Sequence, residues 1–322
     1  MARVQTVTER FRNRAARVIL PLHQNPGSPV SLNIVVGIAT AGRPEILSQT
    51  LVDLRRQSRI PDAVVVCAPS EADFGVAREV DPGAPARFLL GARGLTRQRN
   101  RIIDASPEAD VMLFLDDDFL LDPGYVAAIE QAMNADPSIV VATGLVLADG
   151  INGPGLGFAE GLSVLSHPRR DRTAIEPVFS GYGCNMALRL APMRAHRLAF
   201  DEVLPLYGWQ EDVDLCRQLS PHGRIVQVDA AQGVHLGTKS GRNSGVRLGY
   251  SQIANPLYLA RKKQGYPLGR ALEHATRNMA ANIVRSLRPE PWVDRRGRLR
   301  GNVLALRDLL RGRMTPQQVL DL

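Results

Sequence analysis

Short apolar runs and longer amphipathic stretches alternate along the first half of the sequence. The apolar runs occupy residues 32–38, 63–68, 87–90 and 111–115. The stretches with helical spacing occupy residues 44–57, 95–105 and 122–135. Continuous apolar runs of this length are typical of strands that are buried on both faces of a parallel sheet. The alternation therefore predicts an α/β fold, with a mostly parallel, Rossmann-like sheet and helices on both faces.

Local residues indicate where these helices begin. Pro44 suits the first turn of a helix, where its missing N–H costs nothing. Thr96 is expected to be the N-cap of the helix over 95–105. Asp122 and Pro123 are expected in the cap and first-turn positions of the helix over 122–135.

Three consecutive carboxylates follow the fourth apolar run: Asp116, Asp117 and Asp118. Like charges beside a core repel each other and are costly to desolvate, so something positive must compensate them. Ligands of such sheets bind beyond the carboxyl ends of the strands, and a hard cation such as Mg²⁺ or Mn²⁺ prefers carboxylate oxygens. The triplet therefore indicates a metal site. In the alternative interpretation, Asp117 and Asp118 help to cap the helix that follows.

A second group of polar residues lies further along the chain. Glu211 and Asp212 open a predicted helix, where the helix dipole keeps a carboxylate ionised and available as a general base. His235 follows a predicted strand and can complete a metal site. Lys239 and Arg242 lie in a loop rich in glycine and serine, which can close over a diphosphate.

The order and spacing of these pieces resemble the inverting glycosyltransferases of family 2, which have the GT-A fold, and in particular members that assemble bacterial polysaccharides. The segments that carry the resemblance are GIATAGRP (37–44), GARGLTRQRN (91–100), LFLDDDF (113–119), SGYGCNMALR (180–189), YGWQEDVDL (207–215) and GVHLG (233–237). The resemblance implies an enzyme that moves a sugar from a nucleotide-sugar donor to a hydroxyl of a glycan or of a lipid-linked acceptor.

The resemblance also implies roles on the acceptor side of such a site. Asp212 matches the base that takes the proton of the acceptor hydroxyl. Trp209 and Glu211 match residues that orient the acceptor sugar. Gly181 and Gly183 form a turn that lets the backbone approach the substrates closely.

On the donor side, the resemblance implies a divalent cation, Mn²⁺ or Mg²⁺, held by Asp118 and His235. The residues expected to contact the donor are Thr40, Arg43, Arg99, Asp116, Asp117, Lys239 and Arg242. The family often has an Asp or Asn after the second strand to contact the base, but this chain has Cys67-Ala68-Pro69-Ser70 there, with Glu71 or Asp73 as substitutes. A UDP-sugar is favoured on family frequency, and GDP- and dTDP-sugars remain open.

Composition and charge place the chain in a cellular setting. It has 322 residues with 44% hydrophobic content, without an apolar run of the roughly 18 residues that span a bilayer, and three widely spaced cysteines. We therefore expect a cytoplasmic protein with reduced thiols. Residues 1–25 carry five arginines and one glutamate, and residues 238–322 carry 17 Lys/Arg and five Asp/Glu, so both ends are basic.

The basic ends define the expected domain organisation: a basic segment over 1–30, a catalytic domain over 31–245 and a basic helical extension over 246–322. Such ends suit an anionic membrane surface, which would make the protein peripheral on the inner face of the cell membrane. In the alternative interpretation, Leu272, Met279 and Ile283 pack the C-terminal helices onto the rest of the molecule.

Other classes of protein fit the sequence less well. A haloacid-dehalogenase-like phosphatase has Thr or Val where this chain has Leu120, and a sugar nucleotidyltransferase has a basic glycine-rich loop that ATAGRPEIL (39–47) lacks. A basic module that binds membrane or nucleic acid without catalysis leaves the acidic centre unexplained. Aromatic residues make up only 5% of the chain, too few for a stacking platform, so nucleic acid is not an expected partner.

Overall fold

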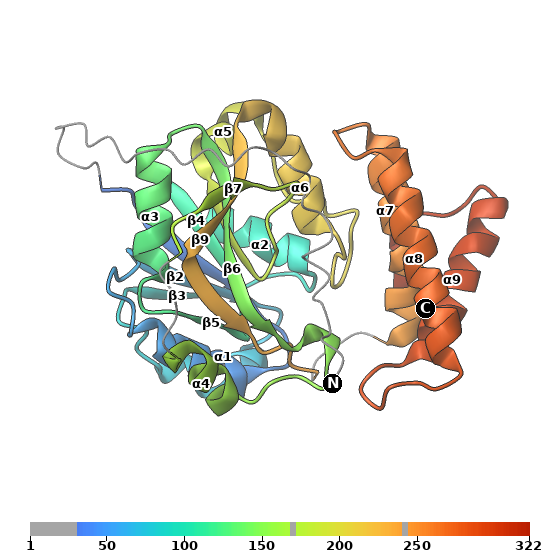
Figure 1. The fold of residues 1–322 in the computed structure, drawn as a ribbon, viewed down its shortest axis with the longest axis horizontal. Coiled ribbons are helices and arrows are strands. Elements are labelled where there is room, and N and C mark those ends of the chain that lie inside the picture. The colour runs from blue at the N-terminus through green and yellow to red at the C-terminus, as the bar shows by residue number, and fades with distance from the viewer. Residues whose placement is uncertain (1–30, 168–171, 240–243) are drawn as a thin grey trace.

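One mixed sheet forms the centre of the computed structural model, which describes residues 31–167, 172–239 and 244–322 (Figure 1). Its strand order is β3-β2-β1-β4-β8-β6-β9-β5, and β7 pairs with β9. The strands are β1 (Ile34–Ala39), β2 (Ala63–Ala68), β3 (Ala86–Leu90), β4 (Val111–Asp116), β5 (Phe119–Leu121), β6 (Ile139–Asp149), β7 (Ile175–Pro177), β8 (Asn185–Arg189) and β9 (Arg224–His235).

The first four strands, whose positions the apolar runs predict, form the parallel part of the sheet. In this part β1 pairs with β2 and with β4, and β2 pairs with β3. β8 is antiparallel to β4 and to β6, and it lies between them. Because β6 is in turn parallel to β9, the carboxyl end of β9 reaches the same edge of the sheet as the end of β4.

Helices cover both faces of this sheet, as the sequence predicts. The helices of the sheet region are α1 (Pro44–Leu54), α2 (Leu95–Asp104), α3 (Tyr125–Ala135), α4 (Phe158–Ser166), α5 (Leu190–His196) and α6 (Glu211–Leu219). Alternate residues of β1 contribute to opposite cores. Ile34, Val36 and Ile38 belong to the core that includes side chains of α1 and α3. Val35 belongs to the core that includes side chains of α2, α5 and α6.

Two of the expected helix starts differ from the structure. Thr96 is not the N-cap of α2, since Gly94 holds that position and the Thr96 hydroxyl donates to the carbonyl of Leu204. α3 begins at Tyr125, after Asp122 and Pro123, and the Asp122 side chain instead accepts from the N–H of Gly124 in the preceding turn. Pro44 does occupy the first turn of α1.

Three longer helices follow the sheet region and lie beside it: α7 (Gly245–Lys262), α8 (Leu268–Ser286) and α9 (Arg295–Leu310) (Figure 1). They share a small core of their own, which includes Tyr250, Ile253 and Ala305. Of the described helices, none combines the length and the apolar character that crossing a bilayer requires.

The packing expected for three apolar residues of α8 is only partly correct. Met279 packs against the core of the three helices, but Leu272 is 49% exposed and Ile283 is 48% exposed. Other residues of α7, of α8 and of the turn between them contact the sheet region, among them Leu259, Tyr266 and Ala271.

Candidate functional site

The predicted polar residues converge at the edge of the sheet where β1, β4 and β9 end. Asp116 is the last residue of β4, and Thr40 directly follows β1. His235 is the last residue of β9, and Glu211 is the first residue of α6. The sheet order thus brings together segments that are far apart in the sequence.

Asp116, Asp118 and His235 form a cluster that can hold a metal ion. One ligand atom of each residue lies within 4.8 Å of the others. His235 Nε2 is 3.4 Å from Asp118 Oδ1 and 3.9 Å from Asp116 Oδ2. Asp118 Oδ1 is buried and accepts no hydrogen bond from the described residues. Two carboxylates and an imidazole, with one carboxylate oxygen left without a donor, fit a divalent cation such as Mn²⁺ or Mg²⁺.

Asp149 orients His235 for this role. The Nδ1–H of His235 donates to Asp149 Oδ1 at 2.9 Å, which leaves Nε2 facing the two carboxylates. The hydroxyl of Tyr182 donates to the other oxygen of Asp149 at 3.0 Å. A carboxylate behind a histidine ligand sets its tautomer and raises its basicity. Burial lowers the pKa of His235, but the neighbouring carboxylates of Asp118 and Asp149 outweigh it and raise that pKa to about 10.

Asp117 points away from this cluster and holds the loop after β1. Its carboxylate is fully buried, accepts from the hydroxyl of Thr40 at 2.6 Å and lies 2.7 Å from Nη2 of Arg43. Its carbonyl accepts from the hydroxyl of Thr50. Burial and the charge of Asp118 raise the pKa of Asp117 to about 7, although Arg43 opposes them. Arg43 is thus one positive partner of the acidic triplet.

Asp212 lies at the start of α6 with its carboxylate against the glycine turn. Its Oδ2 accepts from the N–H of Gly183 at 2.9 Å, and its Oδ1 accepts from the N–H of Val213 at 2.7 Å. Burial raises the pKa of Asp212, and these two N–H groups counteract it. In its ionised form, an aspartate whose pKa lies above its usual value is a better proton acceptor.

Arg99 connects the two acidic groups. It is 1% exposed, and its Nη1 donates to Glu211 Oε1 at 2.8 Å. Its Nη2 donates to the carbonyl of Gly183 at 2.7 Å and lies 3.3 Å from Asp116 Oδ1. The guanidinium also lies over the rings of Phe114 and Phe200. The resemblance places Arg99 on the donor side; in the structure its guanidinium contacts Glu211, Gly183 and Asp116.

The glycines at 181 and 183 lie where a side chain would not fit without displacement. A Cβ at Gly183 would be 3.1 Å from Glu211 Oε1 and 3.2 Å from Asp212 Oδ2. A Cβ at Gly181 would be 2.9 Å from Cγ of Met186. The turn therefore approaches the carboxylates of α6 closely, next to the expected acceptor side.

The remaining expected residues lie around this centre. Trp209 is partly buried, and its carbonyl accepts from Asn255 of α7 at 2.8 Å. The Nζ of Lys239 donates to the carbonyls of Gly150 and Ile151. Arg242, the other basic residue expected on the donor, lies outside the described residues.

Asp149 and Tyr182 are part of the site but do not appear among the residues expected from the sequence. Asp149 ends the apolar stretch of β6, just as Asp116 ends that of β4. A carboxylate at the end of a buried strand was therefore a signal that could have identified Asp149. Tyr182 gives no such signal, because its role depends on the contact with Asp149.

Comparison with known proteins identifies the fold. No protein-family model matches the sequence, and no curated protein sequence matches it. Solved structures do match, among them TarS 1–349 of S. aureus in complex with UDP-GlcNAc, with 16% identity over 89% of this chain and 83% of that chain and a TM-score of 0.53. The mannosyltransferase PcManGT of Pyrobaculum calidifontis in complex with GDP-Man and Mn²⁺ has 15% identity over 94% of this chain and 88% of that chain, with a TM-score of 0.53.

A third structure, GalNAc-T7 with UDP, GalNAc and Mn²⁺, has 12% identity over 91% of this chain and a TM-score of 0.51. The chain spans 56% of that protein and 44% of a longer TarS chain. At these identities the likeness is one of fold. Together with the sheet topology, it confirms the predicted GT-A fold.

Proposed function

We propose that the protein is a metal-dependent glycosyltransferase that moves a sugar from a nucleotide-sugar donor to a hydroxyl of its acceptor with inversion. The observation that carries this proposal is the joining of the Asp116–Asp118–His235 cluster to the Glu211–Asp212 pair through one buried arginine, Arg99. The fold is shared with the solved complexes of TarS with UDP-GlcNAc and of PcManGT with GDP-Man and Mn²⁺.

The chain's own residues divide the work of this reaction. Asp212 accepts the proton of the acceptor hydroxyl, whose oxygen forms a bond to the anomeric carbon of the sugar. The bond from that carbon to the diphosphate oxygen breaks, and the electron pair leaves with the nucleoside diphosphate. Asp116, Asp118 and His235 would hold the cation, which when bound stabilises the charge on the departing diphosphate. A single displacement, without a covalent glycosyl-enzyme intermediate, inverts the configuration at this carbon.

We favour a UDP-sugar as donor and keep GDP- and dTDP-sugars open. The position of Asp73 fits a role near the nucleotide. Its carboxylate accepts from the N–H of Gly42 at 2.6 Å, and Gly42 lies in the loop after β1. The acceptor that we propose is a glycan or a lipid-linked saccharide in polysaccharide synthesis, in keeping with the family 2 resemblance. On this view the protein works in the cytoplasm, at the inner face of the membrane.

The experiment is a donor screen with purified protein, Mn²⁺ and a panel of UDP-, GDP- and dTDP-sugars. We expect one donor to release its nucleoside diphosphate, and we expect EDTA to abolish the release. Asp118→Asn should weaken the metal-dependent binding of that donor, because a neutral amide loses the charge that holds the cation. Release of inorganic phosphate from phosphate esters, with every nucleotide sugar left intact, would contradict the proposal.

A further inference from the structure

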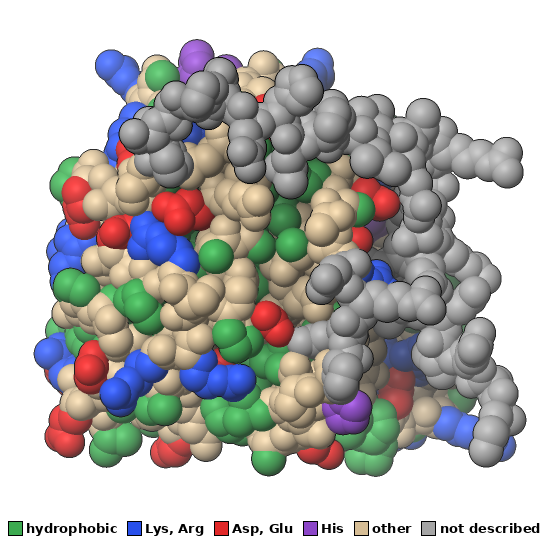
Figure 2. Space-filling view, turned by 60° about the vertical axis from the view of Figure 1, so that its left-hand side comes forward, with side chains coloured by type: hydrophobic (Ala, Val, Ile, Leu, Met, Phe, Trp, Pro, Cys, Tyr) green, Lys and Arg blue, Asp and Glu red, His purple; other side chains and the backbone are tan. Residues whose placement is uncertain are grey.

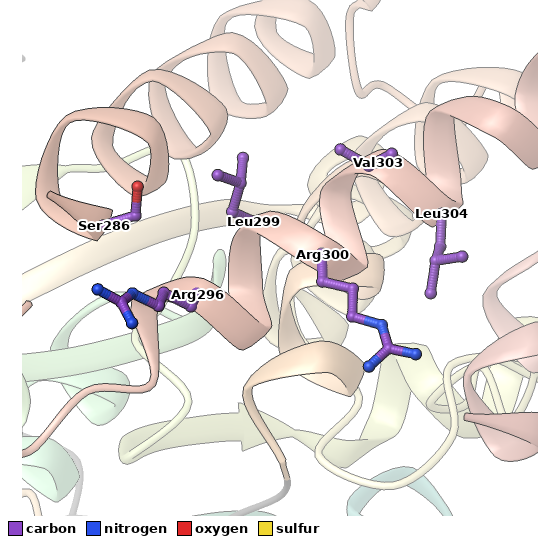
Figure 3. Close-up of a pocket in the computed structure, with 6 residues that line it drawn as sticks. All are labelled: Ser286, Arg296, Leu299, Arg300, Val303 and Leu304. Atoms are coloured by element: carbon purple, nitrogen blue, oxygen red, sulfur yellow. The ribbon is translucent and has the colours of Figure 1, made fainter.

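A shallow groove runs between the last two long helices, away from the site described above. Its volume is about 380 Å³, and its lining residues are Ser286, Arg296, Leu299, Arg300, Val303 and Leu304. Figure 3 shows Arg296 to Leu304 along α9, with Ser286 at the end of the neighbouring helix. We call these six residues, with Leu287 and Leu310, the α8–α9 face.

Apolar side chains on the α8–α9 face are unusually exposed. Leu287 is 80% exposed and Val303 is 57% exposed. Leu310, seven residues after Val303 and therefore on the same side of α9, is 89% exposed. Single exposed apolar residues are normal on a soluble protein, but a group of them around one groove indicates a contact surface.

The same face carries cations that the described part of the chain leaves without a counter-charge. Arg296 and Arg300 are exposed and form no ion pair with any described residue. The acidic residues nearby in the sequence are already engaged. Glu290 pairs with Arg285 and Arg295, and the Asp294 side chain caps α9 by accepting from the N–H of Gly297.

These arginines work against the helix that carries them. Arg296 and Arg300 lie in the first two turns of α9. The N-terminal end of a helix carries a partial positive charge, which disfavours cations there. Arg296 and Arg300 are also four residues apart, where like charges on one helix repel. An anionic partner of Arg296 and Arg300 would relieve both effects, which favours a binding role for these two arginines over a stabilising one.

We propose that the α8–α9 face docks onto the surface of a bilayer that contains anionic lipid. Arginines that alternate with exposed aliphatic side chains match such a surface. The guanidinium groups lie at the level of the lipid phosphates, and the aliphatic groups enter the boundary of the acyl chains. On a view of the sheet region, by contrast, acidic and basic side chains are interspersed among the visible described residues (Figure 2). This inference deepens the membrane location proposed above, because it names the surface that binds, and it does not rest on the proposed glycosyl transfer.

The test is flotation of the full-length protein with vesicles of phosphatidylcholine, alone or mixed with phosphatidylglycerol, at low and high salt. We expect binding only to the mixed vesicles, and we expect high salt to release the protein. The double variant Arg296→Gln/Arg300→Gln should bind them about 30-fold more weakly. The matched control is Arg55→Gln/Arg197→Gln, which removes the same charge from exposed positions of the sheet region and should bind as the wild type does.

A second variant, Leu287→Ser/Val303→Ser, keeps every charge and tests the apolar part of the face. It should also weaken binding, and circular dichroism will show that its helices remain folded. Equal weakening in the Arg55/Arg197 control would overturn the proposal, because overall charge would then account for binding. Unchanged binding in both α8–α9 variants would overturn it too. A third result would also overturn the proposal: the wild type self-associates and does not bind vesicles, and the Leu287→Ser/Val303→Ser variant no longer self-associates. The face would then be an interface between copies of the protein.

Discussion

The guanidinium of Arg99 and the carboxylate of Glu211 form a buried pair at 2.8 Å, although 112 residues separate them in the sequence. The same guanidinium donates to the carbonyl of Gly183, whose N–H donates to Asp212. The position of the proposed base therefore depends on an arginine that belongs to another helix.

Arg99→Met should destabilise the protein strongly, because it leaves the buried carboxylate of Glu211 without its positive partner. Breaking a buried ion pair from one side costs about 3–5 kcal/mol of unfolding free energy. Arg99→Lys should lower the unfolding free energy by a smaller amount. The ammonium keeps the positive charge, but it cannot donate to three acceptors as the planar guanidinium does. Chemical denaturation measures both changes. Arg97→Met is the control on the same helix. Because Arg97 is exposed, its loss should change the unfolding free energy by less than about 1 kcal/mol.

Asp149→Asn should weaken binding of Mn²⁺ about 10- to 100-fold, the usual effect of removing the carboxylate behind a histidine ligand. Isothermal titration calorimetry with Mn²⁺ measures the affinity directly and needs no catalytic turnover. Asp104→Asn, an exposed carboxylate at the end of α2, should leave the affinity unchanged. If both variants bound Mn²⁺ as tightly as the wild type, Asp149 would have no part in the metal site.

Asp212→Asn should abolish most of the transfer while leaving the donor bound. The amide cannot accept the proton of the acceptor hydroxyl, so the rate should fall by about 10²–10⁴-fold. Nucleotide affinity, measured by fluorescence or calorimetry, should stay near that of the wild type. An equal loss of donor affinity would place Asp212 on the donor side and leave the base unidentified.

Lys262→Met should loosen the C-terminal helices from α6. The ammonium of Lys262 in α7 lies 2.8 Å from Asp201 and 2.7 Å from Asp214 of α6, and these three side chains are 16%, 17% and 3% exposed. Removal of the cation leaves two carboxylates close together, so we expect an unfolding free energy lower by about 3 kcal/mol. Lys263→Met makes the same substitution at the next, exposed position and should have little effect. Similar losses in the two variants would show that the pairs with Asp201 and Asp214 contribute nothing.

The sequence alone determined the elements whose pattern is local. Apolar runs located β1 to β4, because a strand buried on both faces needs consecutive apolar residues. The carboxylates at 116–118 and the Glu211–Asp212 pair were found as motifs, since each occupies a few adjacent positions after a strand or at the start of a helix. The N-cap of α2 and the start of α3 were misplaced, because several residues in a row could have served as caps.

Only the tertiary structure decided which of these groups meet. Asp149 lies 86 residues from His235, and the two side chains touch because β6 pairs with β9 in parallel. Asp117 binds Arg43 and Thr40 while its neighbours face the metal cluster, because successive side chains at the end of a strand point in different directions. The sequence also did not reveal that Leu272 and Ile283 are exposed. Helical spacing shows which residues share a face of a helix, but not what covers that face. Contacts between distant residues follow from the order and direction of the strands, and no local pattern in the sequence encodes them.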